Sequence, residues 1–204
     1  MNVKIVSILL LAMLSLTGCS RFKKTIDPSP SVGSYHHPAS KSIQRVAVLP
    51  MESHREDRKA AELLQQSIIK SLRARGAFEI IEVPATQMGF FQSGVVRNGR
   101  YDERQLVALH KQLNVDAVMF SSLNHARLFT PQSWSAICHI VDVRESTIIA
   151  TAEGVWDMSN SPDVIRFQKF VETHNLDLEN PELASELPRA VAEFAALEIS
   201  LELY

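Results

Sequence analysis

Hydrophobic and polar positions alternate with two different periods along residues 45–204, and the changes of period divide this part of the chain into strands and helices. The first apolar run, 45–50, is short, rich in valine and closed by proline, as in a buried strand. Apolar residues then recur every three or four positions up to Gly76, which predicts an amphipathic helix. A second short apolar run follows at 78–83. The order strand, helix, strand predicts a parallel, right-handed βαβ unit.

The next segments predict one more helix and three strands. Residues 102–112 have helical spacing, and residues 115–123 form an apolar run suited to a central strand. Between 134 and 140, apolar Trp134, Ala136, Cys138 and Ile140 alternate with polar Ser135 and His139. Another strand is predicted at 148–156. Because the polar corner between these last two strands is short, we expect them to pair as an antiparallel hairpin.

Polar residues with capping chemistry mark the expected helix starts. Ser53 and Glu56 have the spacing of a capping box before the first helix. The Ser-Pro-Asp run at 161–163 places a cap, a first-turn proline and an acid at another helix start. The Asn-Pro-Glu run at 180–182 repeats this signal for a last helix, which Pro188 should kink or split. The complete order predicts an α/β fold, a mixed β-sheet with packed helices in two or three layers.

The start of the chain has the pattern of an export signal. Lys4 precedes an apolar run of about a dozen residues, the length of a signal-peptide core and too short for a spanning helix. The run ends in Leu16, Thr17, Gly18 and Cys19. This spacing resembles the lipobox of bacterial lipoproteins, which implies cleavage after residues 1–18 and attachment of acyl chains such as palmitate to Cys19. The alternative is an ordinary secretory signal in which Cys19 is incidental.

Residues 19–42 are expected to form a lipidated, flexible tether. They have no apolar periodicity and are dense in Ser, Pro, Lys and His. A coil of about 20 residues spans about 25 Å on average, so the folded body should stay close to its membrane. Ser20 follows Cys19, whereas the sorting rule of bacterial lipoproteins needs Asp at this position to keep a lipoprotein in the inner membrane. This resemblance implies an outer-membrane lipoprotein whose body faces the periplasm.

Charge and cysteine content narrow the classes of function. The formal net charge is −2, and cleavage would remove Lys4 (+1) and give −3, so nucleic-acid binding is not expected. Cys138 is the second of two cysteines, and no intramolecular disulfide is available if Cys19 carries lipid. Cys138 lies in an apolar alternation, which favours an inert buried thiol. Residues 43–204 are therefore expected to form a single α/β domain stabilised by its core.

Four segments resemble motifs of the CsgG family. They are RVAVLP at 45–50, GAFEIIEV at 76–83, LNVDAV at 113–118 and IVDVRESTII at 140–149. The family patterns are VAVLPF, F-x-V-V-E-R, G-A-D-x-V and V-D-V-x-T-G-x-I. The family includes the curli secretion channel and the LpoB-type lipoprotein activators of penicillin-binding proteins, and its fold is similar to the N-terminal domain of TolB. The resemblance covers about residues 45–156 and implies a fold more than a function.

The chain departs from the family at several places. Val83 stands where the family often has Arg, and Glu145 and Ser146 replace the Thr-Gly corner. The curli channel adds two long membrane-spanning hairpins, whose strands need about 9 to 11 residues each. Neither 85–100 nor 124–133 is long enough for such a pair. A pore subunit is therefore not expected, and the tether is shorter than in LpoB-type members.

The sequence contains no pattern typical of a metal site or an active site. The seven histidines lack the close pairing of zinc ligands, apart from the adjacent His36 and His37 in the tether. His54 follows the first strand, near Glu52 and Glu56, and is a candidate ligand site. Its alternative role is an ordinary position beside a helix start. No nucleotide-binding or hydrolase motif occurs, so no cofactor, metal or enzyme activity is expected.

These observations lead to three hypotheses. The first is a lipid-anchored, non-catalytic interaction or assembly module of the envelope, whose partners are the membrane and an envelope protein or further copies of itself. The second is a ring-forming subunit of a CsgG-like secretion or surface-assembly system. The third is a small-ligand or hydrolytic role centred on His54. Candidate partner contacts, each of which is otherwise a core residue, are Phe90, Phe91, Phe129 and Trp134.

Overall fold

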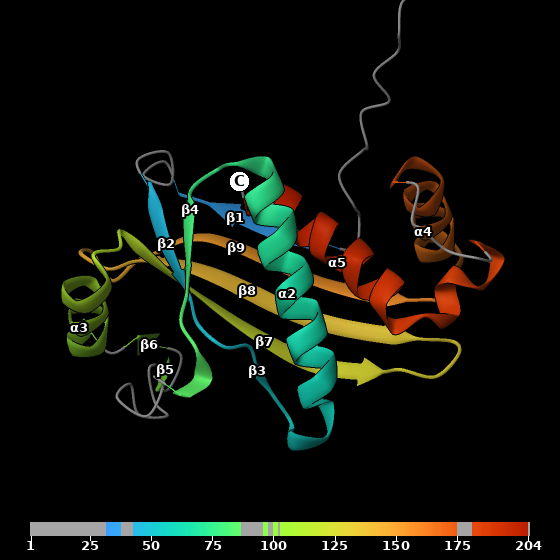
Figure 1. Cartoon of the computed structure of the whole chain (residues 1–204), viewed down its shortest axis with the longest axis horizontal. Helices are drawn as coiled ribbons and strands as arrows, with labels where there is room; N and C mark the ends of the chain where they lie inside the picture. Colours follow the sequence, from blue (N-terminus) through green and yellow to red (C-terminus); the bar gives the residue numbers. More distant parts are fainter. Residues whose placement is uncertain are drawn as a thin grey trace, which may run out of the picture.

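The fold is a mixed β-sheet with helices on both faces (Figure 1). The computed structural model of the protein describes residues 32–37, 43–86, 96–97, 100–101, 103–174 and 181–203. The main sheet has seven strands in the order β1-β9-β8-β7-β2-β4, and β3 pairs with β7 beyond the end of β2. This arrangement confirms the predicted α/β class with a mixed sheet.

The predicted βαβ unit forms the parallel part of the sheet. Strand β2 (Arg45–Val48) lies between β4 (Glu79–Glu82) and β7 (Ala117–Arg127) and is parallel to both. Helix α2 (Arg58–Arg75) is the crossover between β2 and β4. The valines and alanine of β2 are fully buried because helices cover both faces of this central strand.

Three long antiparallel strands form the rest of the sheet. Strands β8 (Ser133–Asp142) and β9 (Ile148–Asp157) make the predicted hairpin, and β8 also pairs with β7. Within β8, Trp134 and every second residue after it up to Ile140 face a helical layer, as the alternation predicts.

An edge strand lies within the segment that the sequence predicted as tether. Strand β1 (Val32–His36) pairs antiparallel with β9, and the backbone N–H of His37 continues the pairing by donating to the carbonyl of Ile149 at 2.8 Å. Only the first residue of β1, Val32, is buried. The strand therefore depends on backbone hydrogen bonds and leaves little hydrophobic pattern in the sequence, which is why periodicity did not indicate it.

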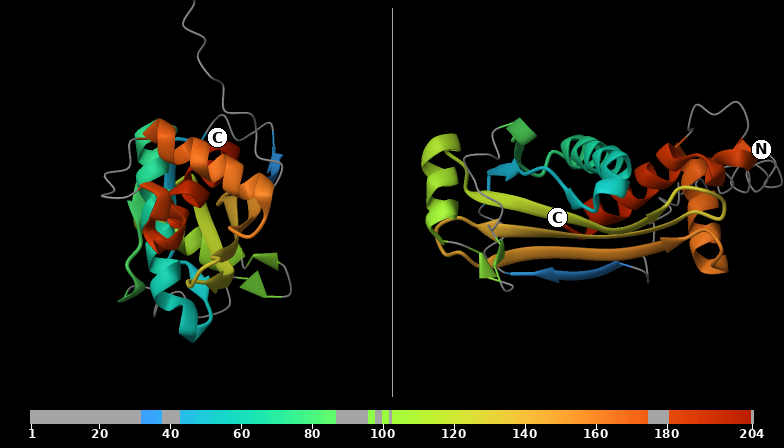
Figure 2. Two further views of the ribbon diagram at one scale, coloured as in Figure 1. Left: turned by 90° about the vertical axis from the view of Figure 1, so that its right-hand side faces the viewer. Right: turned by 90° about the horizontal axis from the view of Figure 1, so that it is seen from below.

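Helices cover the two faces of the sheet unequally (Figure 2). Helices α2 and α5 (Pro188–Glu202) pack on one face, and α4 (Ser161–His174) closes the end of the sheet where β9 stops. Helix α3 (Glu103–Leu113) packs on the opposite face, near the start of β7. The short hairpin of β5 (Val96–Arg97) and β6 (Arg100–Tyr101) lies on the side opposite α2.

Helix α2 begins later than predicted and has no capping box. Ser53 belongs to β3 (Glu52–Ser53), so the prediction that it caps the helix is wrong. A 3₁₀ turn, η2 (Arg55–Asp57), precedes α2, and no side chain caps the start of either helix. The pairing of β3 with β7 extends the strand region past the position where the local pattern placed the helix start. The predicted stop at Gly76 is confirmed, with φ at 64°.

The last helix is split, as the proline predicted. A 3₁₀ segment, η4 (Pro181–Glu186), is followed by α5, which begins at Pro188. Proline suits the first helical turn because its missing N–H would have no intrahelical partner there. Helix α4 begins at Ser161, also as predicted.

Gly154 in β9 makes room for one of the two tryptophan side chains of the core. A Cβ atom at this position would lie 2.5 Å from Cζ2 and 2.6 Å from Cη2 of Trp156. Trp156 is fully buried, so the indole lies over the glycine backbone and packs between the sheet and α5. In this strand glycine is needed for a close approach and not for a turn.

Replacing Gly154 with alanine should destabilise the fold by about 2 kcal/mol, because the indole of Trp156 would have to shift in a packed core. Gly33→Ala is the matched control, since Gly33 also lies in a strand and a Cβ there would meet no atom within 4 Å. Urea unfolding of both variants measures the difference. Equal stability of Gly154→Ala and Gly33→Ala would contradict this account of the core.

Candidate interaction surface

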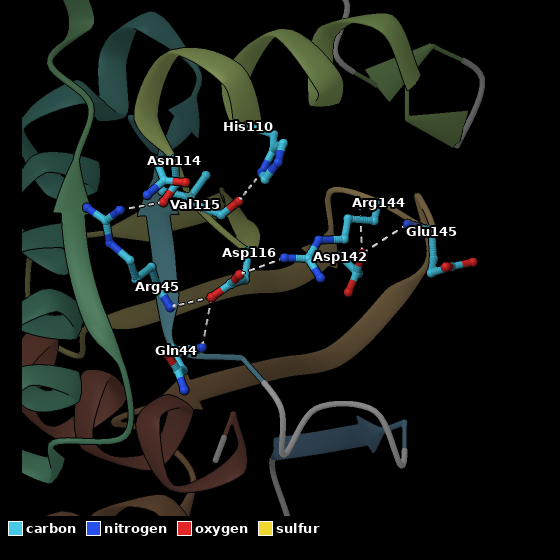
Figure 3. Close-up of polar contacts among 9 residues, drawn as sticks. All are labelled: Gln44, Arg45, His110, Asn114, Val115, Asp116, Asp142, Arg144 and Glu145. Carbon is cyan, nitrogen blue, oxygen red and sulfur yellow. Dashed lines mark hydrogen bonds and ion pairs between the residues drawn. The ribbon is translucent and has the colours of Figure 1, made fainter.

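A carboxylate at the start of β7 joins three parts of the sheet (Figure 3). The Oδ2 atom of Asp116 accepts the backbone N–H groups of Gln44 at 3.1 Å and Arg45 at 3.0 Å. Its Oδ1 atom lies 3.4 Å from Nη2 of Arg144, in the corner between β8 and β9. Asp116 therefore holds the beginning of β2 and the β8–β9 corner beside the beginning of β7.

The polar groups around Asp116 are also paired within the chain. Arg45 donates from Nη1 to the carbonyl of Asn114 at 2.6 Å, and its Nε pairs with Glu79 at 3.1 Å. Nδ1 of His110 lies 2.7 Å from the carbonyl oxygen of Val115. The segments that resemble CsgG motifs thus build a structural corner, and no catalytic pair is evident in it.

Two residues of this corner have left-handed backbone conformations. Asn114 has φ at 51° and Ser146 has φ at 54°. Both stand where the CsgG-like motifs have glycine, the residue that adopts this conformation without steric cost. Asparagine tolerates it better than serine does. Each of these two turns therefore carries backbone strain that a glycine would not have.

A second polar network closes the opposite end of the sheet. Nε1 of Trp156 donates to Glu198 at 2.7 Å, and Nε of Arg166 donates to the other carboxylate oxygen of Glu198 at 3.0 Å. Nη2 of Arg166 also donates to Asp163 at 2.5 Å, and Asp163 accepts the backbone N–H of Asp157 at 2.9 Å. Asp163 and Glu198 are buried, and Arg166 pairs with both of their negative charges. These hydrogen bonds fix α4 and α5 against the end of the sheet.

The loop between β7 and β8 presents an aromatic side chain to the outside. Phe129 is 73% exposed, and the guanidinium of Arg127 lies 5.9 Å from its ring centroid. Gln132 holds the loop beside η4, because its Nε2 donates to the carbonyl of Ser185 at 2.9 Å. Phe129 thus remains a candidate contact.

Trp134, the other aromatic candidate in this region, belongs to the core. It is fully buried, and its Nε1 donates to Oε1 of Gln132 at 3.1 Å. The prediction that Trp134 contacts a partner is therefore wrong, and the core alternative is correct. The sequence alternation at 134–140 identified the face of Trp134 but not what covers it.

Between α3 and α4, the sheet face opposite α2 and α5 carries no helix in the described part of the chain (Figure 2). We call this area the open face. Its residues from β1, β8 and β9 are Tyr35, Ser135, Ile137, His139, Thr151, Glu153 and Val155. Tyr35 and Val155 are each 51% exposed, and Ile137 belongs to neither core cluster. The open face is mixed in character, with apolar side chains set among hydroxyl and charged groups.

The titratable groups near the open face do not form a reactive pair. Burial lowers the pKa of His139, opposed by the charge of Glu153, and Nδ1 of His139 lies 3.1 Å from Oγ1 of Thr151. Cys138 lies on the other, helix-covered face, where burial raises the pKa of its thiol to about 12, and this confirms the predicted buried cysteine. His54 is exposed at the start of η2 and caps nothing with its side chain.

Within the ranges that the structure describes, no group of three or more His, Cys, Asp or Glu could hold a metal ion. No helix there is both long and apolar enough to cross a membrane. Several predicted positions lie outside the described residues, namely Leu16, Thr17, Gly18, Cys19, Phe90 and Phe91.

Asp116→Ala should lower the free energy of unfolding by about 2 kcal/mol, because the N–H groups of Gln44 and Arg45 lose their acceptor. Ser146→Gly, in the same corner, should instead raise it by up to about 1 kcal/mol, since it removes a left-handed serine. Thermal and urea unfolding of both variants test this pair. A neutral Asp116→Ala variant would show that the corner does not depend on the carboxylate.

No family model matches this chain, and no curated protein matches it. Among solved structures, it is similar to the PelC dodecamer of Paraburkholderia phytofirmans, with TM-score 0.46, 15% identity, and coverage of 80% of this chain and 95% of that chain. It is also similar to lipoprotein GNA1162 of Neisseria meningitidis, with TM-score 0.42, 18% identity, and coverage of 64% and 94%. The C-terminal domain of Escherichia coli LpoB aligns with TM-score 0.38, 14% identity, and coverage of 55% and 81%. The resemblance to CsgG stays a prediction from the sequence.

Proposed function

We propose that this protein is a lipid-anchored, non-catalytic lipoprotein of the bacterial envelope that binds another envelope protein through the open face. The observation that carries this proposal is a sheet face on which none of the described helices lies, in a chain whose first residues have a lipobox pattern. Residues 1–18 are the signal peptide in this proposal, and Cys19 carries the lipid. Ser20 supports attachment to the outer membrane with the body in the periplasm.

The composition of the open face supports a protein partner over a small molecule. Its apolar side chains lie on neighbouring strands, with Ser135 opposite Val155 and Ile137 opposite Glu153. A non-obligate protein interface has about the same share of apolar area as the rest of a protein surface, so a face that mixes apolar and polar groups suits one.

In this proposal the folded body begins earlier in the chain than the sequence predicts, because β1 belongs to its sheet. Residues 43–204 remain the folded α/β body, and β1 adds Val32–His36 to its sheet. The tether that joins Cys19 to the body is then residues 20–31. A coil of this length spans about 20 Å on average, so the body is held near the membrane surface.

A ring-forming subunit is the second candidate. Strands β1 and β4 are the two outer strands of the main sheet, and each has a second edge without a partner strand in the described residues. Such edges can pair with another chain. Because the two edges belong to different strands, pairing β1 of one copy with β4 of the next would be heterologous and could close into a ring.

Replacing Cys19 with serine should release the protein from membranes, because the acyl chains would have no thiol for attachment. Fractionation of cells into soluble and membrane pools measures the change, with Cys138→Ser as the control that removes the other cysteine. Retention of the Cys19→Ser variant in the membrane pool would contradict the lipoprotein assignment.

A photo-crosslinking residue in place of Val155 should capture a discrete partner in intact cells, because this position lies on the open face. The matched control is the same residue in place of Val107, which is exposed on α3. A single adduct at position 155 and none at 107 is the expected result. An adduct of twice the chain mass would favour self-association, and no adduct at 155 would contradict binding through this face.

A further inference from the structure

Exposed large hydrophobic side chains gather at one end of the molecule. Tyr35 and Val155 lie on the open face and Val107 lies on α3. The other exposed large hydrophobic residues in the described part of the chain, which we call the apolar tip, are Leu128, Phe129, Ile165, Leu183 and Leu187. They belong to the β7–β8 loop, α4, η4 and the residue before α5, the elements that face the viewer in the left view of Figure 2.

The chain also enters the sheet from this end. Strand β1 begins at Val32 opposite Gly154 and runs to His36 opposite Ala150. Strand β9 runs the other way and ends at Asp157, three positions beyond Gly154 and next to α4. Three residues of strand span about 10 Å, so the point where the N-terminal segment joins the sheet lies close to the apolar tip.

The length of the preceding chain limits how the body can be oriented. Thirteen residue steps separate Cys19 from Val32, which is about 45 Å when fully extended and about 20 Å on average as a coil. The α3 end of the sheet, at Ile148, lies six strand positions from Gly154, or about 20 Å from this attachment point, compared with about 10 Å for the end next to α4. With Cys19 in a membrane, the end that carries the apolar tip is therefore the nearer one.

We propose that the apolar tip of the anchored protein lies in the lipid interface of the membrane that holds Cys19. This inference rests on the proposed lipid anchor and adds a second, weaker membrane contact that orients the body. The chemistry of the tip suits a lipid surface, because Phe129 is largely exposed and Arg127 places a cationic group beside its ring. Nε of Arg127 donates to the carbonyl of Pro131 at 2.7 Å, and its Nη2 lies 3.9 Å from Oδ1 of Asp157, so these two contacts fix the position of the guanidinium.

Attachment of a polarity-sensitive fluorophore to single cysteines tests the proposal. The full lipidated chain carries Phe129→Cys, Leu183→Cys or, as the control at the far end, Val107→Cys. Leu183→Cys leaves the Phe129 ring in place and so tests the tip without removing its main side chain. The unmodified chain should take no label, since Cys138 is buried and Cys19 carries lipid. Each variant is reconstituted into phosphatidylethanolamine and phosphatidylglycerol vesicles, with and without brominated acyl chains.

The expected result is blue-shifted emission and quenching by brominated chains at positions 129 and 183, with neither effect at 107. Equal, water-like emission at all three positions in protein that floats with the vesicles would overturn the inference and leave the lipid anchor intact. Quenching at all three positions would also overturn it, because the body would then have no preferred end at the membrane. Failure of the protein to float with vesicles would overturn both the anchor and this inference.

Discussion

The hydrogen bond between Trp156 and Glu198 is the interaction on which the helical face of the sheet depends. The indole lies against Gly154 in the sheet, and its N–H reaches a buried carboxylate on α5. Because an unpaired buried carboxylate would cost several kcal/mol, Glu198 also requires Arg166 from α4. One side chain of the sheet thereby sets the positions of two helices that follow it in the chain.

A second carboxylate has the same role at the opposite end. Asp116 accepts backbone N–H groups at the start of β2 and contacts Arg144 in the β8–β9 corner. Both ends of the sheet are therefore closed by acidic side chains whose hydrogen bonds are made inside the fold. The two surfaces that we propose for contact with other molecules, the open face and the apolar tip, contain none of the residues of these two networks.

The elements with strong periodicity were predictable, and those held by backbone pairing alone were not. The βαβ unit, the β8–β9 hairpin and the break at Pro188 follow from local pattern and proline chemistry. Strand β1 was missed because only Val32 of its residues is buried. The candidate Trp134 was misassigned for a related reason: alternation shows that a tryptophan lies on one face of a strand, but not whether helices cover that face.

The sequence by itself determined the order of strands and helices, the inert environment of Cys138 and the lack of any motif for chemistry. Those properties depend on residues close together in the chain. Only the tertiary structure decided which sheet face stays open, which residues accompany the buried Glu198, and at which end the N-terminal segment enters the sheet. These depend on contacts between distant segments, such as residues 32 and 154 or 156 and 198, which hydrophobic periodicity does not record.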